Sequence, residues 1–338
     1  MAGNSNFTTI LSSTLSNYRK QLTDNIFGDR PLSRWLMEKK RTRMLSGGVK
    51  IVEPLIYASG QAGSYGGYDQ LTITPQSGLT AAEYDWRQLY ATVAISGIEE
   101  AQNNGKEAIL NLLEAKIMQA EETLKDSVNA QLFGDGTGNT NKEWLGLDAL
   151  IGGMDETPTT PVQAGIATVG GIDGQSGTDE YWNSIIAGQD ATPASLTLAL
   201  MTTPYNTASK GNDKPDAIFT TQTLFEAYEA LLQPSVRRSH GKSADAGFDN
   251  LLFKGKPIFY DDDCTAGAVY MINSKYLTLV GHKDRWFKNS GFTENTASAH
   301  ATSGASTVTD ARYSLITAYG NLTCRNRARQ ARMVNFTA

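Results

Sequence analysis

The sequence has little of what most enzymes and metal sites are built from. Only two of its 338 residues are cysteine and three are histidine. Cys264 and Cys324 are far apart and show no Cys-x-x-Cys spacing, which argues against a disulfide framework or a zinc site and predicts two buried thiols. His240, His282 and His300 fall in different segments without ligand spacing. Because no Gly-x-Ser-x-Gly elbow is present either, neither catalysis nor a cofactor is expected.

Long hydrophobic runs are also missing. Hydrophobic residues make up 40% of the chain, but no apolar run approaches the roughly 18 residues that a membrane-spanning helix needs. A transmembrane helix is therefore excluded, and no membrane partner is expected. Residues 1–19 lack the basic start and apolar core of a secretory signal, so we expect an intracellular product.

Charge is distributed unevenly along the chain. Residues 1–50 hold nine basic and three acidic side chains, and residues 311–338 hold five arginines and no acid. The rest carries a net charge of −16, although the whole chain carries only −5. Basic arms that lie across acidic surfaces of the same or a neighbouring subunit fit this pattern, and so do arms that touch nucleic acid. Subunit contact is favoured, because a dedicated DNA reader is usually basic overall and has a recognisable motif.

A long helical stripe is the most informative feature that is present. Apolar residues recur every three or four positions and predict a helix over Gly105–Phe133, about 44 Å long at 1.5 Å per residue. A long core helix in an ordinary domain is an equal alternative on periodicity alone. On the opposite, acidic face Glu121 precedes Lys125 by four residues and supports the helix. The apolar face holds Ile109, Leu113, Ile117, Ala120, Leu124, Val128 and Leu132, and the acidic face holds Glu107, Glu114 and Glu121.

The glycines from Gly134 to Gly138 predict the end of this helix. A phosphate-binding loop opens a helix, whereas these glycines follow one, where glycine is favoured as a cap. The same stretch fails as a calcium loop, because its sixth and twelfth positions are Thr140 and Gly146.

Before the helix, the sequence predicts a β excursion. Val49–Tyr57 goes out and Trp86–Ser96 returns, with a glycine-rich tip between them. An isolated hairpin buries too little surface to be stable, so it needs another surface. A sheet edge of the same domain is one candidate, and an arm onto a neighbouring subunit is the sharper hypothesis. Residues 1–45 are interpreted as an extended or partly helical arm without its own core, with one short amphipathic piece near Leu32–Met44.

The second half of the chain predicts a mixture of helices and strands, and the fold class is α+β. Residues 152–177, rich in Gly, Thr and Pro, are expected to form a domain boundary or a surface loop, and the Ser/Thr/Ala/Gly-rich residues 293–309 an exposed loop. The expected helices are Thr197–Ala208 and Thr223–Leu232, the latter with Phe225, Tyr228, Leu231 and Leu232 on one face. The expected strands are Ala217–Thr220, Leu251–Phe253, Pro257–Tyr260, Ala268–Asn273, Arg312–Ala318 and Leu322–Phe336. The last strand would align at least three arginines, which could meet the acidic middle of the chain.

Asp261, Asp262 and Asp263 form the densest acidic cluster. Neighbours in a strand point to opposite faces, so at most two of these carboxylates converge. They are predicted to be turn acids after a strand. A hydrolase that uses them remains the alternative from a different functional class.

The order of these elements resembles the major capsid proteins of tailed phages, with the Hong Kong 97-type fold. The motifs are spread over nearly the whole chain. They are the segments 98–105 and 132–138 around the long helix, Leu145-Gly146-Leu147, Pro215–Thr220 with the helix to Arg237, Phe253–Asp262, Val269–Asn273 and the closing Arg325–Phe336.

The resemblance implies a division of the chain into five parts. They are an N-terminal arm at 1–45, an extended β-hairpin or E-loop at 46–96, a peripheral domain with the spine helix at 97–155, an axial domain at 156–282, and a β return with the terminal strand at 283–338.

The resemblance also implies a function and partners. The chain would form hexamers and pentamers of an icosahedral virion capsid, assembled in the host cytoplasm around non-specifically held double-stranded DNA pumped in through a portal protein. An encapsulin-like nanocompartment shell, which encloses an enzyme, is the related alternative. Contacts between subunits are expected at Arg34, Lys39, Arg41, Arg43, Tyr57, Tyr65, Tyr68, Glu107, Glu114 and Glu121.

Two departures from the family pattern lead to further expectations. No long charged coiled segment precedes the arm, so any scaffold would be a separate protein. Residues 51–96 contain no lysine, so the covalent lysine–asparagine cross-link of some family members is not expected. Noncovalent contacts or cement proteins would then stabilise the shell.

Overall fold

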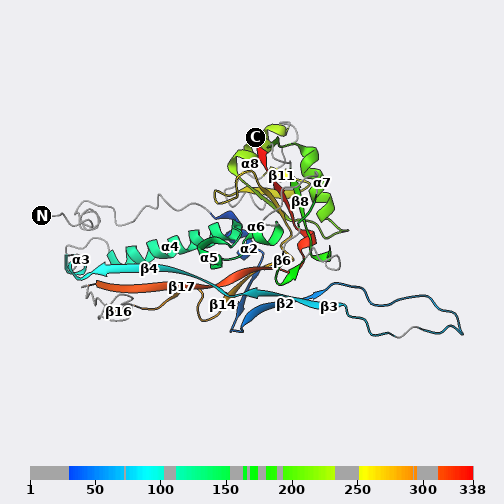
Figure 1. Ribbon diagram of the computed structural model, residues 1–338. Coiled ribbons are helices and arrows are strands. Elements are labelled where there is room, and N and C mark those ends of the chain that lie inside the picture. Colours follow the sequence, from blue (N-terminus) through cyan, green and yellow to red (C-terminus); the bar gives the residue numbers. More distant parts are fainter. Residues whose placement is uncertain are drawn as a thin grey trace. The chain divides into compact units, whose positions relative to one another are not determined.

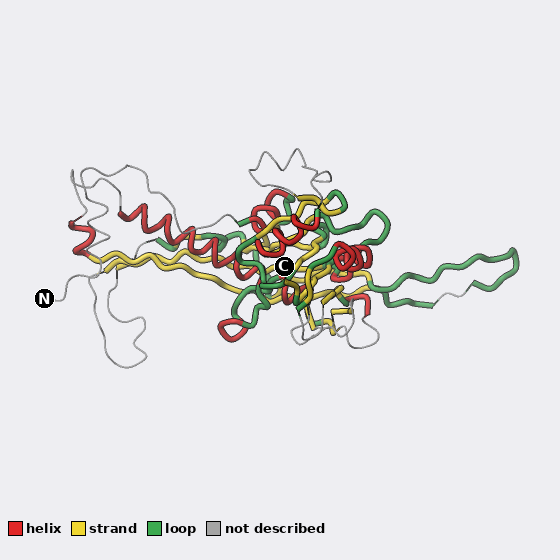
Figure 2. Tube along the Cα trace, turned by 90° about the horizontal axis from the view of Figure 1, so that it is seen from above, coloured by secondary structure: helices red, strands yellow, loops and turns green. Residues whose placement is uncertain are grey.

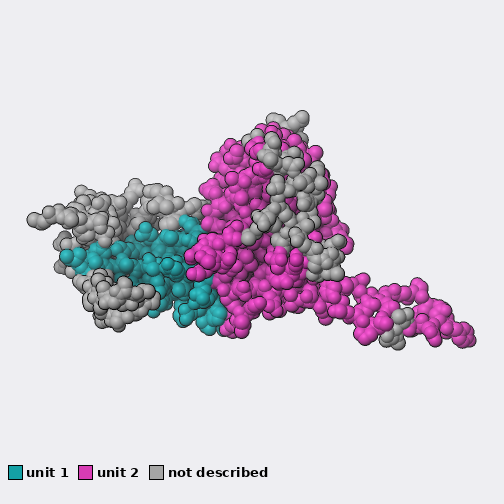
Figure 3. Space-filling view, viewed as in Figure 1, with its two compact units in different colours: residues 1–29, 88–128, 282–319 teal, residues 30–87, 129–281, 320–338 magenta. Residues whose placement is uncertain are grey.

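A computed structural model gives the fold of the chain, which divides into two compact units (Figure 3). Unit 1 comprises Met1–Asp29, Gln88–Val128 and His282–Tyr319, and unit 2 comprises Arg30–Arg87, Asn129–Gly281 and Gly320–Ala338. The structure describes residues 30–71, 74–102, 112–152, 163–165, 168–173, 180–188, 193–232, 251–291, 293–294 and 311–337. Within these ranges, no helix combines the length and hydrophobicity that a bilayer crossing requires.

Unit 2 is built on a seven-stranded mixed sheet. Most neighbouring strands are antiparallel, but β10 pairs with β12 and β18 pairs with β8 in parallel. The predicted strands over 217–220 and 251–253 are confirmed to the residue. The order is β11 (Leu251–Phe253), β12 (Lys256–Tyr260), β10 (Ala217–Thr220), β13 (Val269–Ile272), β18 (Ala331–Val334), β8 (Ser184–Gly188) and β5 (Gln163–Gly165).

Both faces of this sheet are covered, so its central strands are apolar along their whole length instead of alternating. Ile218 and Met271 belong to the core cluster shared with helices α7 (Leu198–Ala208) and α8 (Gln222–Leu231). The adjacent residues in the same two strands, Phe219 and Tyr270, contact other elements. Trp35 lies edge-on to Phe219, with their ring centroids 5.4 Å apart. The predicted face of α8 is right for Phe225 and Tyr228, but Leu231 is exposed.

The first described helix packs on this sheet, and residues 30–45 belong to unit 2. The expected amphipathic piece is helical only over α2 (Pro31–Glu38) and continues as strand β1 (Thr42–Leu45). Leu32, Trp35 and Leu36 are buried. The rest of the predicted arm, residues 1–29, lies outside the described residues.

A second sheet has the long strand β17 (Ala311–Cys324) at its centre, flanked by shorter strands. β17 begins in unit 1 and ends in unit 2. The predicted strand at Arg312–Ala318 is therefore part of a longer one. The other members are β1, β4 (Arg87–Ser96), β14 (Leu277–His282), β15 (Lys288–Asn289) and β16 (Thr293–Glu294).

Helix α4 (Leu112–Phe133) is the described part of the predicted long helix and lies alongside β4 (Figures 1 and 2). Its predicted end at Phe133 is confirmed, whereas residues 103–111 lie outside the described residues. Four stripe residues are buried as expected: Ala120, Leu124, Val128 and Leu132. Before it, α3 (Gly97–Gln102) starts with a capping box, in which the Ser96 and Glu99 side chains each accept from the other residue's backbone N–H.

The turn after α4 is a close approach of backbone segments, as the glycines predict. Gly136 has a φ of 75°, and a Cβ at Gly146 would lie 2.4 Å from the carbonyl oxygens of Gln131 and Gly134. Asp135 accepts the Thr137 N–H at 2.9 Å, and this hydrogen bond lowers the pKa of the Asp135 carboxyl. The short helices α5 (Gly138–Asn141) and α6 (Leu147–Ile151) follow.

The predicted hairpin exists, but its return strand is a different segment. β2 (Lys50–Ile56) pairs with β3 (Leu79–Asp85) from Lys50↔Asp85 to Ile56↔Leu79. The segment predicted to return, β4, instead pairs with β17. The connection between β2 and β3 projects from unit 2 (Figure 3).

Short elements complete the described chain and correct two further expectations. The predicted loop at 152–177 contains β5 and the two-stranded sheet of β6 (Thr168–Val169) and β7 (Ile172–Asp173). The predicted last strand is interrupted by the 3₁₀ turn η4 (Arg327–Arg329) before β18. The turn η2 (Glu180–Trp182) and the pair β9 (Ala194–Ser195) and β19 (Phe336–Thr337) are the remaining elements.

Candidate functional site

The root of the β2–β3 hairpin is fixed to its own unit by one face. Side chains of β2 alternate, with Ile51, Glu53 and Leu55 buried and the positions between them exposed. From β3, Tyr84 donates its hydroxyl to the Cys324 carbonyl oxygen at 2.7 Å, and burial raises the pKa of Tyr84. The exposed face of the hairpin therefore stands on a rigid base.

Beyond this root, the connection over residues 57–78 has no strand in its described part. Tyr57 at its base stacks on Tyr181 of the same unit, with centroids 5.4 Å apart. The hairpin and its connection also expose several large apolar side chains, and clustered exposed apolar side chains mark interaction surfaces. They are Val52, Ile56, Tyr65, Tyr68, Leu71 and Leu79.

The basic residues predicted for subunit contact have unequal surroundings. Arg34 lies 3.6 Å from Glu38 on the surface, and Lys39 is exposed. Arg43 instead reaches inward and contacts Glu53 at 3.1 Å. Whether any of them touches a second subunit remains a prediction.

Glu53 is the functional candidate that sequence reasoning missed. Its side chain is only 1% exposed, yet it faces Arg43 and, at 4.0 Å, Arg325. The Thr323 hydroxyl lies 3.4 Å away as a donor. A buried carboxylate needs such partners, because removal from water is costly. The sequence could have indicated its burial, because residues 51, 53 and 55 of a strand point to the same face and the other two are the apolar Ile51 and Leu55.

The terminal arginines also have partners within the chain. Arg327 is fully buried and donates to the carbonyl oxygens of Leu150, at 2.7 Å, and Trp182, at 3.2 Å. Arg332 lies 3.0 Å from Asp148. The expectation that these arginines meet acids of the middle segment is confirmed for Arg332, although they do not share one strand face.

A basic groove of about 730 Å³ lies beside the hairpin root, within unit 2. We use this name for the groove lined by Arg41, Pro54, Leu55, Ile56, Tyr181, Trp182, Lys275, Tyr276, Arg325, Asn326, Ala328 and Arg329. Its basic residues, Arg41, Lys275, Arg325 and Arg329, come from three distant chain segments. Of the predicted contact residues, only Arg41 belongs to it.

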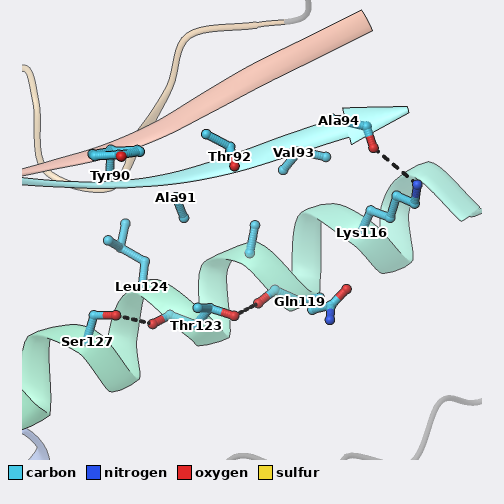
Figure 4. A pocket seen from close by; sticks show the side chains of 11 residues that line it. Tyr90, Ala91, Thr92, Val93, Ala94, Lys116, Gln119, Thr123, Leu124 and Ser127 are labelled. Carbon is cyan, nitrogen blue, oxygen red and sulfur yellow. Dashed lines mark hydrogen bonds between the residues drawn. The ribbon is translucent and has the colours of Figure 1, made fainter. Parts of the chain in front are cut away.

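Helix α4 and β4 enclose a second groove, of about 530 Å³, in unit 1 (Figure 4). Val93, Ala120 and Leu124 are buried along it, and Lys116 closes one end by donating to the Ala94 carbonyl oxygen at 3.1 Å. Lys116 also pairs with the buried Glu99 at 2.9 Å.

The acidic face of α4 is exposed where the structure describes it. Glu114 and Glu121 are both exposed, and Glu107 lies outside the described residues. The expected Glu121–Lys125 pair is replaced by a contact between Lys125 and Glu122, three residues apart. Either spacing brings the two side chains together on a helix.

The acidic cluster after β12 is a structural junction. Asp261 is buried and accepts from the Leu32 N–H at 3.3 Å and from Asn129 Nδ2 at 3.0 Å. Asp263 accepts from the same amide at 2.8 Å, so two carboxylates converge, as expected. Asp262 and Asp263 are both exposed, in contrast to Asp261. Within the described ranges, no group of three or more His, Cys, Asp or Glu could hold a metal ion.

The chain resembles known proteins in structure. No protein-family model matches the sequence, and no curated protein matches it. Among solved structures, the capsid asymmetric unit of cyanophage A-1(L) superposes with a TM-score of 0.68 at 18% identity, over 96% of this chain and 97% of the other. The chain has the fold of phage capsid proteins.

Other structures with this Hong Kong 97-type fold agree. The capsid of an empty GTA particle matches with a TM-score of 0.58 at 9% identity, over 100% of both chains. The SrpI encapsulin of Synechococcus elongatus matches less well, with a TM-score of 0.52 at 9% identity, over 94% of this chain and 92% of the other. Because each match covers 94% or more of this chain, the capsid fold accounts for nearly the whole chain and not for one domain of it.

Proposed function

We propose that this chain is the major capsid protein of a tailed-phage head. Copies would assemble into hexamers and pentamers of an icosahedral shell around double-stranded DNA. The observation that carries the proposal is the likeness to the cyanophage capsid subunit over nearly the full length of both chains. A structural protein also agrees with the state of Asp261, which is buried and hydrogen-bonded to Leu32 and Asn129.

Within this proposal the elements take the roles of the capsid fold. The β2–β3 hairpin acts as the E-loop that lies over a neighbouring subunit, and α4 is the spine of the peripheral domain. The seven-stranded sheet with α7 and α8 is the core of the axial domain. Exposed apolar side chains at the hairpin, Tyr65 and Tyr68 among them, support the first of these roles, because they need cover.

The proposed partners follow from the same role. Neighbouring copies would contact Arg34, Lys39, Tyr57 and the acidic face of α4 as well as the hairpin. The packaged DNA would be held without sequence specificity, a portal protein would admit it, and assembly would take place in the host cytoplasm.

Self-assembly of the purified chain tests the proposal. We expect sedimentation and electron microscopy of the full chain to show closed shells of uniform size. A 36.6 kDa monomer at every concentration would contradict it.

The encapsulin likeness defines the second candidate, a nanocompartment shell. The contents of particles from the natural source separate the two. A phage head contains nuclease-protected duplex DNA and has a portal vertex, whereas a nanocompartment contains a cargo protein and no genome.

A further inference from the structure

The basic groove holds more positive charge than its own chain neutralises. Its lining includes four cationic side chains and no carboxylate. Among the described residues, Nε of Arg41 is buried without a hydrogen-bond partner. A buried donor without a partner is unfavourable, so a bound ligand that accepts a hydrogen bond from this N–H would stabilise the complex.

The neighbouring acids only partly offset this charge. Asp213 lies 3.5 Å from Lys275, whose own side chain is largely exposed. Glu53 lies 4.0 Å from Arg325, but it is already engaged by Arg43 at 3.1 Å. These two carboxylates therefore leave the groove with a positive potential, which attracts an anionic partner.

Part of the groove lining is apolar and belongs to a strand with an open edge; we call this part the apolar wall. Pro54, Leu55 and Ile56 of β2 form it, and Ile56 is 80% exposed. In the described chain β2 pairs with β3 alone, so its outer edge has no strand beside it. An extended peptide can lie along such an edge and place alternate side chains on two walls. Pro54 lacks an N–H, which limits how regular the pairing can be.

We propose that the basic groove binds an acidic, extended segment of a neighbouring copy of this chain. The inference rests on the proposed function, because a shell subunit is surrounded by copies of itself. Charge supports the choice of partner: residues 51–310 of a neighbouring copy carry a net charge of −16, which complements a basic groove. The apolar wall favours a polypeptide over duplex DNA, whose phosphate backbone would complement the basic side only. A contact between two different surfaces of one chain also builds rings, as a capsomer requires.

Charge reversal in the groove provides the first test. Arg41 and Lys275 are replaced together (Arg41→Glu, Lys275→Glu), and the matched control reverses two exposed lysines outside the groove (Lys142→Glu, Lys210→Glu). In the groove variant the new glutamates would face the acidic segment of the neighbouring copy, and like charges repel. The yield of closed shells should therefore fall about tenfold or more in this variant and stay unchanged in the control. Circular dichroism verifies that both variants are folded.

The outcomes of this test are distinct. Equal shell yields from the groove variant and the control would overturn the inference and leave the proposed function standing. If the unaltered chain forms no shells, the proposed function fails and the inference fails with it. Normal shells that no longer retain DNA would make nucleic acid the occupant and would also overturn the inference.

A second test needs no substitution and so does not depend on variants that fold. Shells are assembled from a mixture of ¹⁴N- and ¹⁵N-labelled chains and treated with a carbodiimide, which joins amines to carboxylates in direct contact. We expect Lys275 to be joined to an acid of a differently labelled copy. Products that join Lys275 only to Asp213 of the same copy would refute the contact.

Discussion

Asp261 shows how one side chain can connect three parts of unit 2. It lies directly after β12, and its carboxylate accepts hydrogen bonds from the Leu32 N–H in the first turn of α2 and from the Asn129 side chain in α4. The Asp263 N–H also donates to it, at 3.1 Å. Burial is the largest influence on its ionisation and raises the pKa of the Asp261 carboxyl to about 6, although the hydrogen bonds act against this change.

This pKa predicts a specific pH dependence of stability. An unfolded aspartate has a pKa of about 3.9, so the folded chain binds more protons between about pH 4 and pH 6. The contribution of Asp261 is therefore fully present below about pH 4 and is lost as pH rises through about 6. Its size is on the order of 2 kcal/mol.

Replacement by asparagine (Asp261→Asn) should remove that contribution. Urea unfolding of the unassembled chain at a series of pH values gives the free energy of unfolding. We expect the wild-type curve to fall relative to the variant's between pH 4 and 6. The exposed neighbour is the control, and Asp262→Asn should leave the wild-type profile intact. Parallel curves for wild type and Asp261→Asn would contradict the assignment.

The two thiols lead to a second prediction at this scale. Cys264 and Cys324 are free and buried, as the sequence predicts, and burial raises the pKa of both, that of Cys324 to about 12. Because the thiolate is the reactive form, iodoacetamide at pH 8 should label neither in the folded chain and both after denaturation. Mass spectrometry measures the labelling, and rapid modification of the native protein would show that the interior opens.

Among the elements, the β2–β3 hairpin offers the sharpest dissection of folding from assembly. The Tyr57 N–H donates to the Gly78 carbonyl oxygen at 3.0 Å, so the two ends of the connection are already adjacent. Residues 58–77 can therefore be replaced by Asn-Gly, which suits a two-residue hairpin turn. A larger deletion, of residues 55–80, is less suitable because it would also remove the buried Leu55.

The shortened hairpin should keep the melting temperature of the unassembled chain, because the described side chains between 58 and 71 are exposed. Closed shells should disappear, since the exposed apolar surface proposed to cover a neighbour is gone. Calorimetry and electron microscopy measure the two properties separately. Normal shells from this variant would refute the role of the hairpin, and a large loss of stability would show that the connection packs on its own subunit.

Elements with strong local patterns could be predicted from the sequence, and their partners could not. The α4 stripe and the strand Ala217–Thr220 are recognisable because burial imposes a period or an apolar run. β3 was missed, since its Leu79–Asp85 segment includes two alanines and two acids and has a weak β pattern. β4 was paired with the nearest strand, whereas its actual partner, β17, begins more than 200 residues later.

At the scale of the whole molecule, the order of motifs indicated the fold, and the structural likeness bears this out. The candidate surfaces were harder, because they are made by long-range folding. The basic groove gathers Arg41, Lys275, Arg325 and Arg329 from three separate regions of the chain, and no local spacing predicts that. Charge counts indicated that the chain ends are basic, but they could not predict that Arg327 is buried or that Arg43 forms an ion pair with the buried Glu53.

The position of β18 has a consequence for how the protein is made. This strand lies between β13 and β8 inside the seven-stranded sheet, yet the ribosome synthesises it after all six other strands of that sheet. Until residues 331–334 emerge, β8 and β5 cannot join β13, and the sheet remains in two pieces. Domains generally fold as units during synthesis, so this one must wait for residues 331–334. A nascent or prematurely terminated chain thus lacks a finished subunit, which would keep incomplete copies out of a growing shell.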